Sequence, residues 1–150
     1  MAEPVQPVAG DTNILFSALL RSRSRFSDIL LQPEHSFYVC ESVLVELFRH
    51  KEKILRLSRV ADDDLARFYH ILLRRVTVYK EDLISPARWR EAHALCREVD
   101  EADTPHVALA LELDGLLWTG DRVLREGLSK RGFTRFFHPG EPDSMVDVAE

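Results

Sequence analysis

Short runs of apolar residues alternate along the chain with longer segments whose apolar positions recur every three or four residues. The short runs predict strands at residues 8–9, 37–40, 76–79 and 116–118, with an edge strand at 133–137. The longer segments predict helices at residues 13–20, 26–31, 41–50, 54–60, 62–73, 86–99, 104–113 and 121–130. Because strands and helices alternate, we predict an α/β fold, a three-layer α/β/α sandwich around a central, mostly parallel sheet.

Proline and glycine refine these boundaries. Pro7 has no N–H to donate to a sheet, so we expect the first strand to be short and to start near Val8. Pro86 is typical of the first turn of a helix. Gly115 and Gly132 follow predicted helices at the position where a left-handed residue often ends a helix.

The length of 150 residues is typical of one domain, which we place at residues 1–138. Residues 139–150 contain two prolines and no apolar periodicity, and they predict an acidic C-terminal tail. Its four acids account for four of the five net negative charges, so the rest of the chain is nearly neutral. There the basic residues form two clusters, Arg21, Arg23 and Arg25, and Arg49, Lys51, Lys53, Arg56 and Arg59. The second cluster is a hypothetical phosphate-binding patch, with solvated helix faces as the alternative.

Several classes of protein are disfavoured. No apolar run is long enough to span a membrane, and the N-terminus has no basic leader, so we expect a cytoplasmic protein with no membrane partner. Cys40 and Cys96 are not part of a CxxC motif, and we interpret both as reduced core thiols. The glycine-rich nucleotide-binding loops, the GxSxG elbow and the HExxH motif are absent from the sequence.

Four carboxylates occupy positions that could converge. Asp11 follows the first strand, Asp121 follows the strand at 116–118, and Asp103 precedes an apolar helix. Glu46 is the only acid within the apolar stretch 43–48. In an open α/β sheet, ligands bind beyond the carboxyl ends of the strands, where these side chains would meet.

Each carboxylate also has a structural explanation. Asp11 and Asp103 could cap helices, Asp121 could be a turn residue, and Glu46 could reach solvent. Together, however, like charges in one crevice would repel one another, and a divalent ion would offset that repulsion. Hard oxygen ligands favour Mg²⁺ or Mn²⁺.

The motifs Asp11-Thr12-Asn13, Glu46-Leu47, Asp103 ahead of 106–111, and Thr119-Gly120-Asp121 resemble the PIN-domain family in order and spacing, over roughly residues 8–137. The resemblance implies a PIN-like fold and an Mg²⁺- or Mn²⁺-dependent ribonuclease. It places the catalytic and metal-binding acids at Asp11, Glu46, Asp103 and Asp121, and auxiliary polar positions at Asn13 and Thr119. Asp100 is the alternative to Asp103, and His106 is interpreted as a packing or hydrogen-bonding residue.

These features predict a metal-dependent endoribonuclease that hydrolyses RNA phosphodiester bonds. Many bacterial PIN domains are VapC-type toxins, so the resemblance also implies a toxin of a toxin–antitoxin pair, an antitoxin partner and a homodimer. The alternatives are a catalytically inactive PIN-like module that binds RNA or a protein partner, and DNA cleavage by the same site.

Overall fold

The structure is a computed structural model that describes residues 6–12, 14, 29, 35–50, 56, 66–67, 70 and 73–138. Outside the described residues lie almost all of the helices predicted at 13–20, 26–31 and 54–60, most of the helix at 62–73, the first basic cluster and the tail at 139–150. Among the helices that are described, none is long and apolar enough to cross a lipid bilayer.

Four strands and four α-helices are described. The strands are β1 (Gln6–Gly10), β2 (His35–Cys40), β3 (Val76–Tyr79) and β4 (Leu116–Trp118). The helices are α3 (Glu41–Arg49), α6 (Pro86–Cys96), α7 (Thr104–Glu112) and α8 (Arg122–Lys130). Two short 3₁₀ helices, η1 (Glu81–Leu83) and η2 (Glu101–Asp103), precede α6 and α7.

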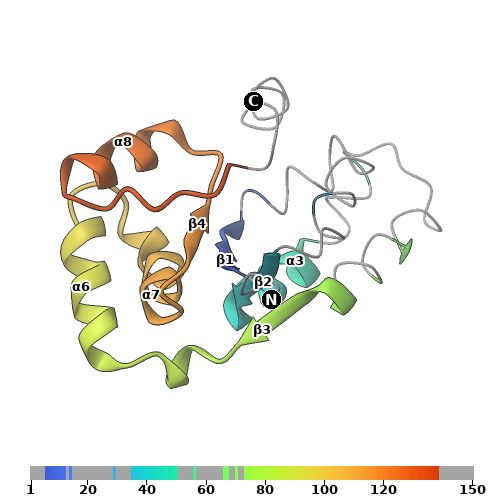
Figure 1. Cartoon of the computed structure of the whole chain (residues 1–150). Coiled ribbons are helices and arrows are strands. Elements are labelled where there is room, and N and C mark those ends of the chain that lie inside the picture. The colour runs from blue at the N-terminus through green and yellow to red at the C-terminus, as the bar shows by residue number, and fades with distance from the viewer. Residues whose placement is uncertain are drawn as a thin grey trace, which may run out of the picture.

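The strands form one sheet in the order β3-β2-β1-β4, and every neighbouring pair is parallel (Figure 1). The predicted α/β fold with a central parallel sheet is therefore confirmed. Since β1 lies between β2 and β4, the residue that follows β1 emerges at the centre of the carboxyl edge of the sheet. That residue is Asp11.

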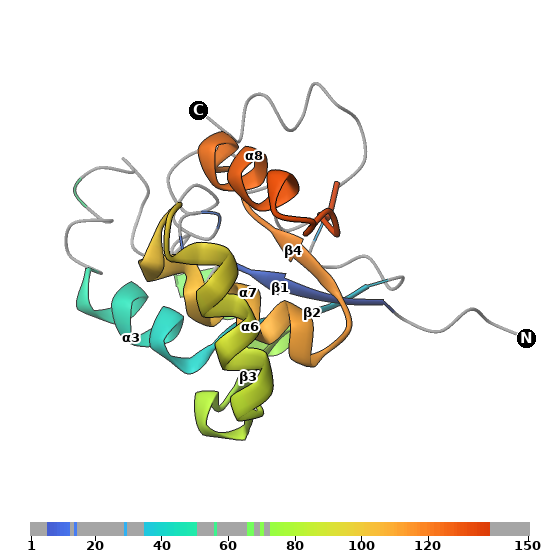
Figure 2. The same ribbon diagram turned by 90° about the vertical axis from the view of Figure 1, so that its left-hand side faces the viewer.

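Helix α7 covers one face of the sheet, and α6 packs against α7 on the side away from the strands (Figure 2). Seven of the nine residues of α7 are buried, which explains why its sequence is apolar on nearly all sides. Cys40 and Cys96 are free and buried, as expected for core thiols. Burial raises the pKa of Cys40 to about 12 and that of Cys96 to about 11, so both stay protonated at neutral pH.

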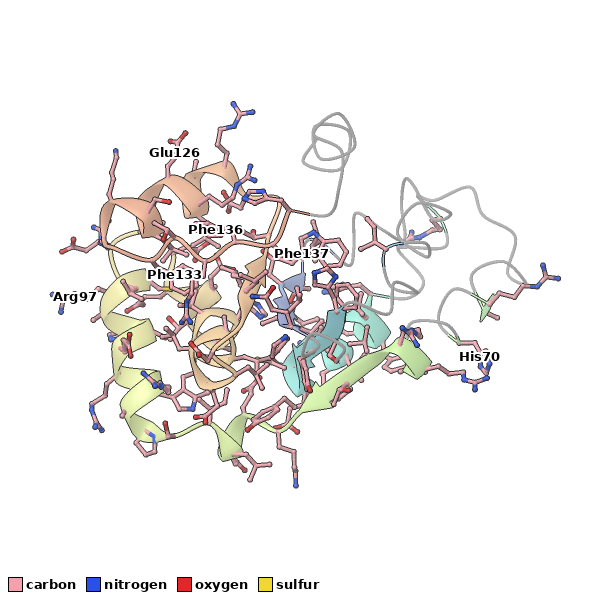
Figure 3. The ribbon with its side chains drawn as sticks, viewed as in Figure 1. His70, Arg97, Glu126, Phe133, Phe136 and Phe137 are labelled. Atoms are coloured by element: carbon pink, nitrogen blue, oxygen red, sulfur yellow. The ribbon has the colours of Figure 1, made fainter. Side chains whose placement is uncertain are left out.

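An aromatic cluster joins β2, β4 and the segment after α8. The ring of Phe37 lies 5.5 Å from that of Trp118, and Phe137 contacts both, at 5.7 and 5.2 Å. Figure 3 shows Phe133, Phe136 and Phe137 along the segment that returns from α8 towards β4. The expected edge strand at 133–137 is only a single bridge, between Leu117 and Phe136, so the sequence pattern there reflects aromatic packing rather than a full strand.

The expectation that β1 begins near Val8 is wrong, because β1 begins at Gln6 and includes Pro7. The register explains how the proline is accommodated. β1 pairs with β2 from Gln6 onward but with β4 only from Val8 onward. At Pro7, β1 is therefore locally an edge strand. The missing N–H of the proline does not leave a carbonyl of β4 without its hydrogen bond, because β4 does not pair with β1 at this position.

The expected role of Gly115 also needs correction. Asp114, with φ of 50°, takes the left-handed position after α7, and Gly115 N–H donates to the carbonyl of Ala110 at 2.9 Å. Gly115 is instead required by packing, since a Cβ at this position would lie 2.5 Å from the Pro7 carbonyl oxygen. Gly132, with φ of 94°, ends α8 as predicted.

We predict that Gly115→Ala destabilises the protein by about 1–3 kcal/mol, because the new methyl group meets backbone that can move only with β1. Chemical denaturation of the two proteins would measure this loss. Gly10→Ala is the matched control, because its Cβ would make an ordinary 3.6 Å contact with Ile14. Equal stability of the Gly115→Ala variant and the wild type would contradict the close approach of Pro7.

Candidate metal-binding carboxylate site

Asp11 is a buried carboxylate at the centre of the carboxyl edge. Its backbone N–H donates to the carbonyl of Trp118 at 3.2 Å, which extends the β1–β4 pairing by one bond. Its Oδ1 accepts from the Ile14 N–H at 2.8 Å, so Asp11 does cap the helical turn that follows. Oδ2 is buried and has no hydrogen-bond partner among the described residues. One oxygen of a side chain that is 2% exposed thus takes no part in the helix cap.

Asp121 lies beyond the neighbouring strand β4. Its backbone is extended, with φ of −82° and ψ of 108°, and its Oδ1 accepts from the Leu124 N–H at 3.1 Å. Asp121 is therefore the N-cap of α8 rather than a turn residue. The buried hydroxyl of Thr119 accepts from the Asp121 N–H at 3.1 Å and fixes the short connection between β4 and α8.

Asp103 occupies the N-cap position of α7 but makes no capping hydrogen bond. Its backbone is helical, with φ of −87° and ψ of −1°, because η2 leads directly into α7. A side chain from a helical residue cannot reach back to the first free N–H groups as an extended residue can. In addition, Pro105 supplies no N–H in the first turn. The interpretation of Asp103 as only a helix cap is therefore wrong.

Burial and neighbouring negative charges shift the pKa of Asp11 and of Asp103. Burial raises the pKa of Asp11, and the charge of Asp121 raises it further, while hydrogen bonds from Thr119 and Ile14 oppose the shift. Burial raises the pKa of Asp103 to about 7, with further increases from the charges of Asp11, Asp100 and Asp121. The structure thus brings Asp11, Asp103 and Asp121 within electrostatic reach of one another, from three separate segments of the chain.

Asp100 has a different role from Asp103. Its Oδ1 accepts from the Ala102 N–H at 3.0 Å, so it caps η2, and its side chain is exposed. A hydrogen bond with Asp100 also favours the protonated form of Asp103. This arrangement supports Asp103 as the inward-lying acid and Asp100 as its neighbour.

Within its described residues, the structure does not link the other predicted site residues to the three aspartates. Glu46 lies in α3 with an exposed side chain, as expected if it reaches solvent, and its charge is not among those that shift the pKa of Asp11 or Asp103. Asn13 lies outside the described residues. His106 is buried, and burial lowers its pKa to about 4, so it is neutral and its packing role is supported. Arg49 and Arg56, the described members of the second basic cluster, are exposed.

The three aspartates meet the chemical requirements of a hard divalent ion. They supply carboxylate oxygens only, their mutual repulsion would be relieved by a cation, and Asp11 Oδ2 is buried without a partner in the described part of the chain. Within the described residues, however, no three His, Cys, Asp or Glu side chains form a ready-made ligand group. Helix capping partly explains why the carboxylates do not already form such a group, because Asp11 and Asp121 each direct one oxygen to a helix N-terminus.

Sequence reasoning missed a row of side chains on α6. Trp89, His93 and Arg97 recur every four residues, with Arg90 next to Trp89, and together with Thr104, the residue after Asp103, they line an open groove. The helical spacing of one aromatic and several basic residues was the signal that could have found it.

Asp103→Asn is predicted to stabilise the metal-free protein above neutral pH, by something on the order of 1 kcal/mol. The native pKa of about 7 lies above the unfolded value, so the wild type loses stability as pH rises from about 4 through 7. Asparagine does not titrate, so the variant should lack this loss. The lowered pKa of His106 acts in the opposite sense, with stability lost as pH falls below 6.5, and it is common to both proteins.

Thermal melting in a chelator between pH 5 and 8 would measure the difference. Asp82→Asn, at an exposed aspartate, is the control for simple loss of negative charge. If Asp103→Asn has the same pH profile as the wild type, Asp103 does not share a crevice with Asp11 and Asp121.

The comparisons with known proteins agree with this geometry. A family model described as the PIN domain matches residues 10–136, a span that begins just before Asp11 and includes Asp103 and Asp121. No curated protein matched the chain. The family match covers most of the sequence and includes β2, β3, β4 and the segment that follows β1 at the carboxyl edge of the sheet. The chain belongs to the PIN-domain family.

Proposed function

We propose that this PIN domain is a metal-dependent endoribonuclease whose site is formed by Asp11, Asp103 and Asp121. PIN domains are generally nucleases and usually use divalent metals. One observation carries the proposal for this chain, namely that Asp103 lies at a helix N-terminus without capping it while burial and like charges raise its pKa to about 7. A partly buried acid that is costly to ionise and caps no helix is typical of a functional site.

The site residues would have different roles in binding the metal ion. Asp11, Asp103 and Asp121 would hold the ion, and the Thr119 hydroxyl, which accepts from the Asp121 N–H, would keep the third of these acids in place. When bound, a divalent ion supplies an activated water and neutralises charge that develops on the phosphate oxygens. The interpretation of Glu46 as a further ligand or as a residue that orients water stays a prediction, and its exposed position on α3 leaves it free to do either.

RNA rather than DNA is the proposed substrate. The alternative of a catalytically inactive module differs in one respect that can be measured, since such a module would bind RNA without cutting it. The toxin role, the antitoxin partner, the homodimer and the cytoplasmic location stay predictions from the resemblance and the sequence.

The purified protein should cleave single-stranded RNA with Mn²⁺ or Mg²⁺ and stop when EDTA is added. Asp11→Asn should reduce the rate on the order of 100-fold or more, because even outer-sphere partners of a metal site contribute 10- to 100-fold. Asparagine retains an oxygen that can accept from the Ile14 N–H, so the variant should keep its helix cap and fold. Gel analysis of end-labelled RNA and of DNA with the same sequence would measure both rates.

Asp114→Asn is the matched control, because Asp114 is an exposed aspartate that pairs with Arg135 on the surface. Mn²⁺ should also raise the melting temperature of the wild type, and Asp103→Asn should lose most of this shift. Cleavage that survives EDTA, or that is equally fast in Asp11→Asn, would overturn the assignment of the site. RNA binding without any cleavage would favour the inactive module.

A further inference from the structure

An open groove runs along α6 and is bordered by Thr104, the residue that follows Asp103. It has a volume of about 520 Å³ and is lined by Trp89, Arg90, His93, Ala94, Arg97 and Thr104. Five of these residues belong to α6 or to the turn after it, and Thr104 is the first residue of α7. Because Thr104 directly follows Asp103, a polymer that presents a phosphodiester to Asp103 can continue into this groove.

We propose that this α6 groove binds the single-stranded RNA that flanks the scissile phosphodiester, an inference that rests on the proposed ribonuclease function. The groove combines an aromatic ring with guanidinium groups, which is the chemistry that single-stranded nucleic acids select. Bases stack on an aromatic side chain regardless of sequence, while arginines contact the phosphates.

The aromatic surface is Trp89. Its side chain is half-buried against the core, and its Nε1–H donates to the Glu81 carbonyl at 3.4 Å. This hydrogen bond and the packing hold the indole in one orientation while part of it borders the groove. A ring that is already held loses little conformational entropy when a base stacks on it.

The charges come from Arg90 and Arg97. Both are exposed, and neither forms an ion pair with a described residue. Figure 3 shows Arg97 projecting from α6 away from the body of the molecule. By contrast, Arg88 on the same helix pairs with Glu91 at 3.0 Å. The guanidinium groups that line the groove are thus those left available for phosphates.

The nearby acidic residues limit which part of α6 the RNA can occupy. A second hollow of about 530 Å³ shares Trp89 and Arg90 with the groove but is otherwise bordered by Glu81, Asp82, Ile84 and Pro86. Carboxylates there would repel phosphates, so we place the RNA between Trp89 and Thr104 rather than beyond Trp89. At the Thr104 end, the Glu101 carboxylate lies 3.1 Å from His93 Nε2, and this contact holds the acid against α6.

The occupant could in principle be an acidic protein segment, but continuity with Asp103 favours RNA. A carboxylate-rich peptide lying in the groove would bring its charges towards Asp103, whose pKa the charges of Asp11 and Asp100 already raise. An RNA strand meets the same carboxylates only where the proposed ion would bind its phosphate.

Binding of a short, fluorescein-labelled oligouridylate to the Asp11→Asn protein in EDTA tests the groove without cleavage. We expect the added double substitution Arg90→Gln/Arg97→Gln to weaken binding and to reduce the slope of log affinity against log salt by about 1.4, or 0.7 for each lost phosphate contact. Arg88→Gln is the matched control on the same helix and should leave the slope nearly unchanged. Fluorescence anisotropy at several salt concentrations measures both.

Trp89 is tested by its own fluorescence. The chain contains two tryptophans, and Trp118 is buried, so stacking of a base should quench Trp89 selectively. In the same background, Trp89→Leu should weaken binding on the order of 10-fold, within the range for loss of one stacked base, whereas Trp89→Phe should retain most of the affinity. Thermal melting of both variants would show whether they remain folded, and rescue by phenylalanine separates stacking from packing.

These results distinguish the groove from the catalytic proposal. Weaker binding by the groove variants supports the groove even if the wild type cuts no RNA, in which case only the ribonuclease proposal fails. If the wild type cleaves RNA and the groove variants bind it with unchanged affinity and salt slope, the ribonuclease stands and the groove is overturned. Binding of an acidic peptide that depends on Arg90 and Arg97, without any such RNA binding, would also overturn it.

Discussion

The buried carboxyl group of Asp11 is the constraint on which the rest of this structure depends. It lies where β1, the strand between β2 and β4, reaches the carboxyl edge of the sheet, so neighbouring segments must arrange their polar groups around it. The Ile14 N–H and the Thr119 hydroxyl lower the free energy of its ionised form, while burial and the charge of Asp121 oppose ionisation. Burial without full compensation is unfavourable for folding, and proteins accept such a cost mainly at functional sites.

The parallel α/β fold and the proximity of Asp11, Asp103 and Asp121, although not of Glu46, could be predicted from the order of strands, helices and acids along the chain. What each aspartate does locally could not be predicted, because it depends on backbone angles. Asp121 caps α8 because its backbone is extended, whereas Asp103 cannot cap α7 because a 3₁₀ turn makes its backbone helical. In both cases the sequence has an Asp directly before a helix, so the sequence pattern alone cannot distinguish the residue that caps from the one that does not.

Packing produced the other differences from the sequence-based expectations. Pro7 was expected to shorten β1, but the staggered start of β4 leaves its missing N–H without consequence. The row of Trp89, Arg90, His93 and Arg97 had a helical spacing that was visible in the sequence, yet its importance depends on Thr104 lying beside it. Such proximity between residues of different helices is a property of tertiary structure, and no local pattern encodes it.

The contact between Gly115 and Pro7 has a consequence at the opposite end of the sheet. β4 pairs with β1 over only three residues, from Val8–Leu116 to Gly10–Trp118, and the close backbone approach at the lower end fixes their alignment. A shift of β4 by one residue would reverse the faces of its side chains and would move Asp121 relative to Asp11. The turn between α7 and β4 therefore fixes the position of Asp121 relative to Asp11. An insertion there, at the opposite end of β4 from the site aspartates, would displace Asp121 from Asp11.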